Sequence, residues 1–290
     1  MVQYSINDLE KLSGIKAHTI RVWERRYHIL EQHRTETNRR RYGDNELRRI
    51  INISILHRNG FKISKIAGFS DSEIEEKVSF LSKDTNRSET QIDSLIMFMV
   101  DHNEKAINDL LTRYIMNHGI EDTFMDVVFP FLKRIGIMWH TGSADISSEH
   151  FISNIFRQRI ISSIDSLSPA FKEGRKRVIL FLPEFELHEI GLLFFNYLIK
   201  KLGHETLYLG QATPISSVVR ANDKWKADII VTGLMSGLPD VNHLDLVSQL
   251  SKLFPKQKVL VAGLLADSSF KIKHSNIFQI RSPEDLKARL

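Results

Sequence analysis

The interpretation of the C-terminal part of this chain depends on one stretch, Glu186-Leu187-His188-Glu189-Ile190-Gly191. The stretch follows an apolar run from Val178 to Pro183 and precedes a helical pattern that begins at Ile190. It therefore places the imidazole of His188 in a loop between a strand and a helix. A single histidine in such a loop is usually structural, so its role depends on what the fold brings beside it.

Short apolar strands alternate with helical patterns from Arg177 onward. The expected strands cover residues 178–182, 206–209, 229–232, 259–261 and 277–280, and the expected helices cover 190–202, 215–225 and 244–254. This alternation predicts a parallel sheet with right-handed crossovers, in which ligands bind at the carboxyl ends of the strands. We therefore predict an α/β Rossmann-like, flavodoxin-like domain over residues 175–290.

Three short motifs fall at the expected carboxyl ends of these strands. Glu186-x-His188-x-x-Gly191 follows the first strand, Thr232-Gly233-Leu234 ends the third, and Ala262-Gly263 follows the fourth. We prefer the motif at Thr232 to Ser236-Gly237-Leu238, because the former ends a strand. The three motifs are expected to lie along one edge of the sheet.

The sequence between residues 91 and 168 has an apolar periodicity that is helical throughout, which predicts a four-helix bundle. A polar run without such periodicity, Ser82 to Ser88, predicts a linker within residues 76–90. The loop between the last two helices holds Trp139-His140, and Glu149-His150 follow ten residues later. Taken alone, these pairs fit a core aromatic at a helix end and a solvated first turn.

The composition limits the chemistry that the 290-residue chain can perform. It contains no cysteine, which excludes disulfides, thiolate zinc sites and cysteine nucleophiles. Its apolar runs are far shorter than the roughly 20 residues of a membrane span, so we expect a cytoplasmic protein without a membrane partner. Residues 1–70 contain 14 Lys/Arg and 7 Asp/Glu, a net charge of +7, which favours a polyanion as partner of this head.

The basic head has the pattern of a helix-turn-helix. Ser5 is expected to cap a helix from Ile6 to Leu12, and Gly14 separates it from a second helix, Lys16 to Tyr27. On the second helix we expect Ile20, Val22 and Trp23 to face the core. The side chains that can offer donors outward are those of His18, Thr19, Arg21, Arg25 and Arg26. Such a helix fits a major groove, and the basic run from Glu36 to Tyr42 is typical of a wing over the DNA backbone.

Four segments of the head, Tyr4-Ser5-Ile6, Ile20 to Tyr27, Arg34-Thr35 and Arg40-Arg41-Tyr42, resemble the winged-helix domain of the MerR family of transcription regulators. The resemblance covers residues 1 to about 75 and implies binding to double-stranded DNA, usually as a dimer on a palindromic operator. The contact residues that it implies are Ser5, His18, Thr19, Arg21, Arg25, Arg26, Tyr27, Arg34, Thr35, Arg39, Arg40 and Tyr42. Asn38 departs from the family glycine, although Asn tolerates a left-handed turn.

Trp-His followed by Glu-His resembles the helical half of the adenosylcobalamin-binding module in CarH-type photoreceptor regulators, which are MerR-family proteins. The motifs of the sheet domain resemble the corrinoid-binding fold. The resemblance makes His188 the lower ligand of cobalt, which imidazole binds well, and Glu186 the partner of its other nitrogen. Gly191, Thr232, Leu234, Ala262 and Gly263 would accommodate the nucleotide tail. Ala262 replaces a family glycine, and its methyl could crowd that tail.

The same resemblance assigns the upper face of the cofactor. Trp139 would pack against the adenosyl group, with Glu149 and His150 beside it, and His140 is a candidate upper ligand after that group is lost. We therefore expect a DNA-binding repressor without enzymatic activity, a homodimer or tetramer, in which adenosylcobalamin senses light or its own supply. Two alternatives stay open: a MerR-type regulator that has lost cobalamin binding, and a corrinoid methyl-transfer protein.

Overall fold

The computed structural model describes residues 4–30, 33–34, 40–81, 88–139, 146–168, 173–234, 243–263 and 274–290. Side chains are described within these ranges except at 33–34, 137–139 and 146. The chain forms two compact units, Met1–Phe156 and Arg157–Leu290. Each unit is described by itself.

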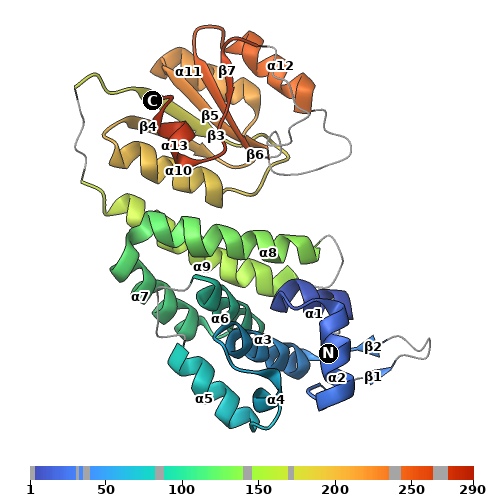
Figure 1. Cartoon of the computed structure of the whole chain (residues 1–290). Coiled ribbons are helices and arrows are strands. Elements are labelled where there is room, and N and C mark those ends of the chain that lie inside the picture. Colours follow the sequence, from blue (N-terminus) through green and yellow to red (C-terminus); the bar gives the residue numbers. More distant parts are fainter. Residues whose placement is uncertain are drawn as a thin grey trace. The chain divides into compact units, whose positions relative to one another are not determined.

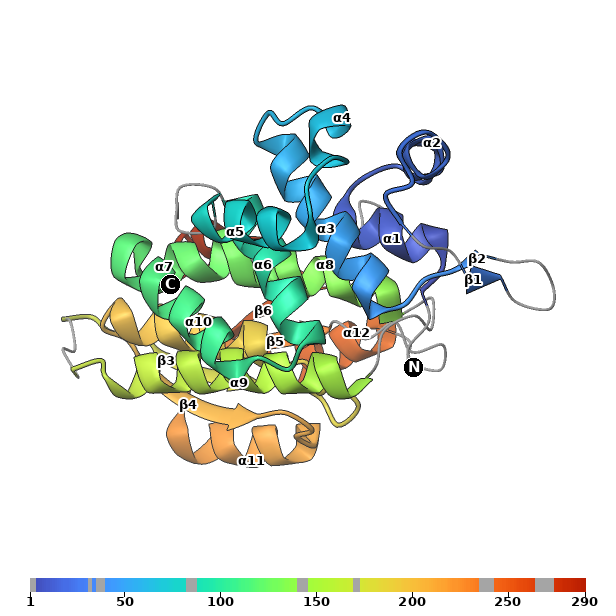
Figure 2. The same cartoon turned by 90° about the horizontal axis from the view of Figure 1, so that it is seen from below.

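The head of the first unit has the predicted helix-turn-helix. Its elements are α1 (Ile6–Ser13), α2 (Ala17–Tyr27), β1 (His33–Arg34), β2 (Arg40–Arg41), α3 (Asp44–Arg58), α4 (Ile63–Ile66) and α5 (Asp71–Leu81). Ser5 caps α1 by accepting the Asp8 N–H, and Gly14 ends this helix at a φ of 74°. The antiparallel pair β1–β2 projects from the helices of the head, as a wing does (Figure 2).

One of the three residues of α2 that were predicted to face the core is exposed. Ile20 and Trp23 are buried, as predicted, whereas Val22 is 40% exposed. Residues three apart share a helix face, but Val22 lies about 200° around the helix from Ile20 at 100° per residue. The expectation that Val22 faces the core was therefore wrong.

The rest of the first unit is helical, and its last helix continues into the second unit. It contains α6 (Ser88–Val100), α7 (Glu104–Thr123), a π-helical turn η1 (Phe124–Val128), α8 (Phe129–Trp139) and α9 (Ile146–Asp165) (Figure 1). Of the predicted linker, residues 76–81 belong to α5 and 88–90 to α6, while 82–87 lie outside the described residues. Both ends of the predicted linker are therefore helical.

The second unit is built on a parallel sheet. Its strands are β3 (Arg177–Phe181), β4 (Glu205–Gly210), β5 (Ile229–Leu234), β6 (Lys258–Gly263) and β7 (Ile277–Gln279). They are connected by α10 (Ile190–Lys201), α11 (Ile215–Trp225) and α12 (His243–Leu253), and α13 (Pro283–Lys287) follows β7. The order β4-β3-β5-β6-β7 is that of a flavodoxin-like sheet, and it confirms the predicted fold class.

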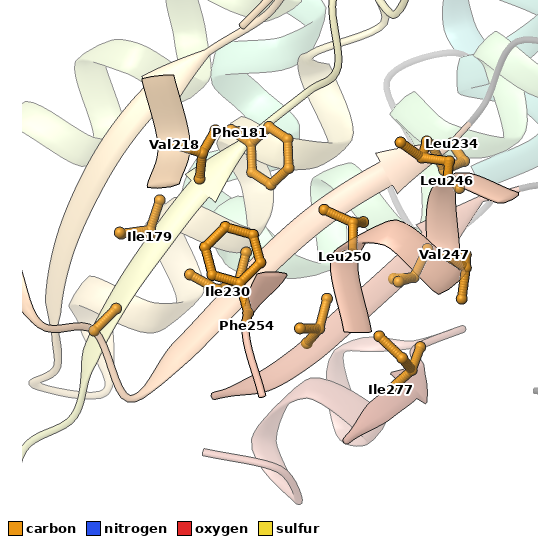
Figure 3. Close-up of a cluster of buried hydrophobic side chains, with 13 residues drawn as sticks. Ile179, Phe181, Val218, Ile230, Leu234, Leu246, Val247, Leu250, Phe254 and Ile277 are labelled. Carbon is orange, nitrogen blue, oxygen red and sulfur yellow. The ribbon is translucent and has the colours of Figure 1, made fainter. Parts of the chain in front are cut away.

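The core of this unit lies between the sheet and two of its helices. Ile179, Phe181 and Ile230 of the sheet pack with Val218 of α11 and Leu250 of α12 (Figure 3). Helix α10 packs against β3, β4, β5 and α13 instead. Because strand order reverses between β3 and β5, the loops that leave their carboxyl ends border the crevice where such sheets bind ligands.

No helix among the described residues has both the length and the apolar character of a membrane span.

Candidate functional sites

Glu186 orients the imidazole of His188 in the loop between β3 and α10. The Glu186 side chain is fully buried, and its Oε1 lies 2.6 Å from Nδ1 of His188. The same oxygen accepts the backbone N–H of His188 at 3.0 Å. The backbone N–H of Glu186 donates to the carbonyl of Pro183 at 2.9 Å, which fixes the turn itself. The carboxylate thus holds His188 by both its backbone and its ring.

This hydrogen bond decides which nitrogen of His188 can bind a metal. When Nδ1 donates its proton to a carboxylate, Nε2 carries the lone pair that can bind a metal. The negative charge of the carboxylate also makes the imidazole more basic and therefore a stronger metal ligand. The side chain of His188 is 68% exposed, so the ring is presented outward. The described residues contain no preformed cluster of three or more metal-binding side chains. A single oriented imidazole is an arrangement that can supply one protein ligand to a metal.

The motifs of β5 and β6 lie side by side at the same end of the sheet. Thr232 pairs with Phe181 on one side and with Val261 on the other, and Gly233 pairs with Ala262. The expected alignment of these motifs at one edge is thus present in the strand register. Sequence reasoning gave no role to Gly233, where an added Cβ would lie 3.0 Å from Cδ2 of Leu182.

Three residues at this end of the sheet are compatible with a bound group. Thr232 is fully buried, and its hydroxyl has no hydrogen-bond partner among the described residues. A buried hydroxyl without a partner costs about 1–3 kcal/mol, so this site favours a polar ligand atom. Gly263 has a φ of 100°, which disfavours any other residue. An added Cβ at Gly191 would meet no atom of the described residues within 4 Å, so the start of α10 has room among them.

Leu234 is part of the core of the second unit. Its side chain is fully buried and belongs to the core cluster that includes Leu246 and Val247 of α12 (Figure 3). The residue lies on the same face of β5 as Thr232, two positions earlier, and on the opposite face from Gly233. Its contact with a cofactor stays a prediction.

The residues predicted for the upper face lie in the first unit. Glu149 and His150 are on α9, with the Glu149 carboxylate accepting the Ser153 hydroxyl at 2.5 Å. Oε2 of Glu149 is 3.5 Å from Nε2 of His150, whose side chain is 63% exposed. Trp139 is the last residue of α8, and His140 lies outside the described residues.

The second helix of the head presents the predicted cationic face. His18, Arg21, Arg25 and Arg26 are exposed, while Thr19 and Tyr27 are partly exposed. The guanidinium of Arg26 lies 5.3 Å from the centroid of the Tyr27 ring. The side chains needed for contacts with DNA are therefore available on one face of α2.

The wing residues have a different placement. Tyr42 is fully buried, and its hydroxyl donates to Glu24 at 2.7 Å; burial and this carboxylate raise the pKa of the phenol. This placement does not favour the expected contact of Tyr42 with DNA. The side chain of Tyr42 instead connects the end of β2 to α2 through its hydrogen bond with Glu24. Arg40 forms an ion pair with Glu24 at 3.7 Å, and Ser5 donates to Asp8 at 2.6 Å.

The remaining wing residues are only partly described. The backbone of Arg34 lies in β1, and Thr35, Asn38 and Arg39 lie outside the described residues.

Comparison with known proteins agrees with both parts of this description. Residues 4–73 match the model of the MerR HTH family regulatory proteins, and residues 91–161 match the model of a B12 binding domain. The chain therefore combines a MerR-type helix-turn-helix with a cobalamin-binding module, which places it in the class of cobalamin-sensing DNA-binding regulators.

Two relatives are similar to this chain along most of its length. The HTH-type transcriptional repressor CarH of Myxococcus xanthus is 28% identical over 274 residues, which cover 91% of this chain and 90% of the relative. The repressor CarA of the same organism is 24% identical over 275 residues, covering 92% and 88%. The monomethylamine corrinoid protein of Methanosarcina barkeri shares the fold, with a TM-score of 0.57 at 16% identity over 70% of this chain and 98% of that chain.

One buried charge beside the site was missed by sequence reasoning. Glu189 is only 7% exposed, and it contacts Arg157 and Tyr208 on other elements. Its position in the loop is visible in the sequence, but nothing local indicates its burial or its distant partners.

Proposed function

We propose that this regulator is a repressor that binds operator DNA and uses adenosylcobalamin as its switch, with light, or alternatively the supply of the cofactor, as the signal. The single observation that carries the proposal is the pair formed by Glu186 and His188. It is an outward-facing imidazole whose Nδ1 is held by a buried carboxylate at the end of β3. This is the arrangement that metal-binding histidines use to fix tautomer and orientation.

The chain offers residues for each part of the cofactor. Nε2 of His188 would bind cobalt from below, the Thr232 hydroxyl would bond to the nucleotide tail, and the open start of α10 at Gly191 would receive that tail. Trp139, Glu149 and His150 would hold the adenosyl group, with His140 available to replace it. When bound, the cofactor supplies a cobalt–carbon bond that light can break.

A switch needs contacts that differ between two states of the protein. In this proposal Trp139, Glu149 and His150 contact the adenosyl group in one state only. Their altered contacts would bias the assembly of a homodimer or tetramer, and thereby the number of α2 helices presented to a palindromic operator. The exposed arginines of α2 supply the DNA contacts in either assembly.

An absorption spectrum tests the cofactor assignment. Full-length protein is mixed with adenosylcobalamin in the dark, freed of unbound cofactor and recorded before and after illumination. We expect corrin bands that co-purify with the protein and change with light, and a different dark spectrum for His188→Ala. Identical bands in the wild type and in His188→Ala would refute His188 as the ligand.

A regulator that has lost cobalamin binding is the second candidate, and Ala262 favours it. Its methyl group stands at the edge where the nucleotide tail would approach, and the residue is partly buried beside Gly233. Absence of corrin bands from the purified protein would support this candidate. A corrinoid methyl-transfer protein shares the fold but does not account for the basic head.

A further inference from the structure

Glu189 is a buried carboxylate directly after the proposed cobalt ligand. Its Oε2 accepts the hydroxyl of Tyr208 at 3.0 Å, and its Oε1 lies 2.5 Å from Nη2 of Arg157. A charge with only 7% exposure is costly to bury unless it is paired and hydrogen-bonded. Oε2 of Glu189 is hydrogen-bonded and its Oε1 is paired with the Arg157 guanidinium, so the buried charge is compensated from two sides.

The partners of Glu189 come from separate elements of the second unit. Tyr208 lies on β4, and Arg157 lies on the part of α9 that belongs to this unit. Burial and the charge of Glu189 raise the pKa of Tyr208, so its phenol stays protonated and remains a donor. The carboxylate is thus held between an edge strand and a helix.

The backbone of Glu189 transmits this restraint to the loop. Its N–H donates to the carbonyl of Leu187 at 2.9 Å, and its carbonyl accepts the N–H of Leu193 in the first turn of α10 at 2.8 Å. His188 therefore lies between two fixed carboxylates. Glu186 sets the direction of the imidazole, while Glu189 fixes the backbone on which that imidazole is mounted.

We infer that Glu189, through Tyr208 and Arg157, is a positioning residue that holds the His188 loop in the geometry needed for axial binding of cobalt. A ligand bond tolerates little misplacement, because a metal site must be held within about 0.5 Å of its working geometry. The inference rests on the proposed function, since it gives a purpose to the fixed loop only if His188 binds the metal.

A purely stabilising ion pair is the competing explanation, and the chain offers a matched control. Glu205 lies on β4, as Tyr208 does, but its ion-pair partners among the described residues are Arg175 and Arg177, which lie outside the His188 loop. Glu205→Gln removes a carboxylate from the same strand. Glu189→Gln and Tyr208→Phe remove, respectively, the charge and one donor at the loop.

Electron paramagnetic resonance of the Co(II) form reports the axial nitrogen directly. Full-length protein labelled with ¹⁵N-histidine is loaded with cob(II)alamin. A histidine ligand then splits each cobalt line into a doublet, the unlabelled benzimidazole of the cofactor gives a triplet, and water gives no splitting. We expect a doublet for the wild type and for Glu205→Gln, and loss of most of the doublet for Glu189→Gln.

Further variants separate positioning from folding. Tyr208→Phe should lose part of the doublet, and Arg157→Lys should retain more of it than Arg157→Gln because the ion pair is restored. In protein without cofactor, hydrogen exchange at the amides of His188 and Glu189 should become about tenfold faster in Glu189→Gln and Tyr208→Phe, as expected for local loosening. Glu205→Gln should leave these amides unchanged.

The outcomes separate the inference from the function on which it rests. A triplet in the wild type would refute His188 as ligand and with it the proposed function. A wild-type doublet that persists in Glu189→Gln and Tyr208→Phe, with unchanged amide exchange, would overturn the inference alone. If Glu189→Gln does not fold, the variants Tyr208→Phe, Arg157→Lys and Arg157→Gln still decide whether the loop is positioned through Glu189.

Discussion

At the scale of single residues, the candidate site consists of a buried acceptor that has a partner and a buried hydroxyl that has none among the described residues. Glu186 is fully buried but satisfied by His188, whereas Thr232 is fully buried with an unused hydroxyl. The carboxylate of Glu186 orients the imidazole that would bind the metal. The hydroxyl of Thr232 can still form a hydrogen bond to a bound molecule. The sequence indicated both residue types at these positions, but only the fold shows their burial.

The carboxylate of Glu186 should affect cofactor affinity through the His188 ring. Glu186→Gln keeps the size but removes the charge that makes the imidazole a strong donor, and loss of such a partner typically costs about 10–100-fold in metal affinity. The measurement is a cobalamin titration followed by absorbance. Glu184→Gln, an exposed change in the same loop, is the control and should have no effect. Equal affinity for both variants would contradict this role.

The hydroxyl of Thr232 should have opposite effects on stability and on binding. Thr232→Val keeps the shape and removes a buried group without a partner, so the protein without cofactor should gain up to about 1 kcal/mol of unfolding free energy. Cobalamin affinity should fall several-fold, because the bond to the tail is lost. Denaturant unfolding and the same titration measure the two quantities. A less stable variant with unchanged affinity would mean that the hydroxyl serves the fold.

At the scale of elements, what could be predicted depended on whether the signal was local. The strands of the second unit were found because buried parallel strands are continuous apolar runs, and Ser5 and Gly14 marked the ends of α1. Val22 was misplaced because the sequence does not show which face of an element meets the core. The ion pairs of Asp93 with Arg58 and Arg134 could not be predicted, because these partners are far from Asp93 in the sequence.

Asp93 joins the head to the helices that follow it within the first unit. This residue of α6 is fully buried and forms ion pairs with Arg58 of α3 and with Arg134 of α8, the latter at 2.8 Å. Arg134 also donates to the carbonyl of Lys11 in α1 at 3.3 Å. Burial lowers the pKa of both arginines.

Removing this carboxylate should destabilise the first unit strongly. Asp93→Ala removes the buried partner of two guanidinium groups and leaves them the exposed carboxylate of Glu89. Breaking a buried pair costs about 3–5 kcal/mol. Because Arg58 is 36% exposed, we expect the low end of that range. Denaturant unfolding measures the loss. Asp109→Ala, which removes an exposed pair with Lys105, should cost far less. Similar losses in both variants would show that the junction contributes little.

At the scale of the whole molecule, charge and cofactor chemistry are divided along the chain. The head has a net charge of +7, whereas the full chain has only +5, so the remainder is slightly acidic. This division favours DNA contacts by the head alone. The uneven charge could be predicted from the composition of the sequence. The combination of a regulator head with a cofactor module could be predicted from the sequence motifs.

DNA binding should depend steeply on salt and on the exposed face of α2. Arg21→Ala should weaken binding and reduce the slope of log affinity against log salt by about 1 if the side chain contacts a phosphate. Electrophoretic mobility or anisotropy at several salt concentrations gives both values. Arg220→Ala, an exposed change on α11, should match the wild type. A weak salt dependence in the wild type would argue against the head as the DNA-binding part.

The central claim is that the state of the bound cobalamin controls DNA binding by the full chain. The most direct test is the DNA affinity of dark-purified protein loaded with adenosylcobalamin, measured on one operator fragment before and after green illumination. We expect tight binding in the dark and a large loss of affinity after light, with no such change in His188→Ala. Equal affinities before and after illumination would contradict it.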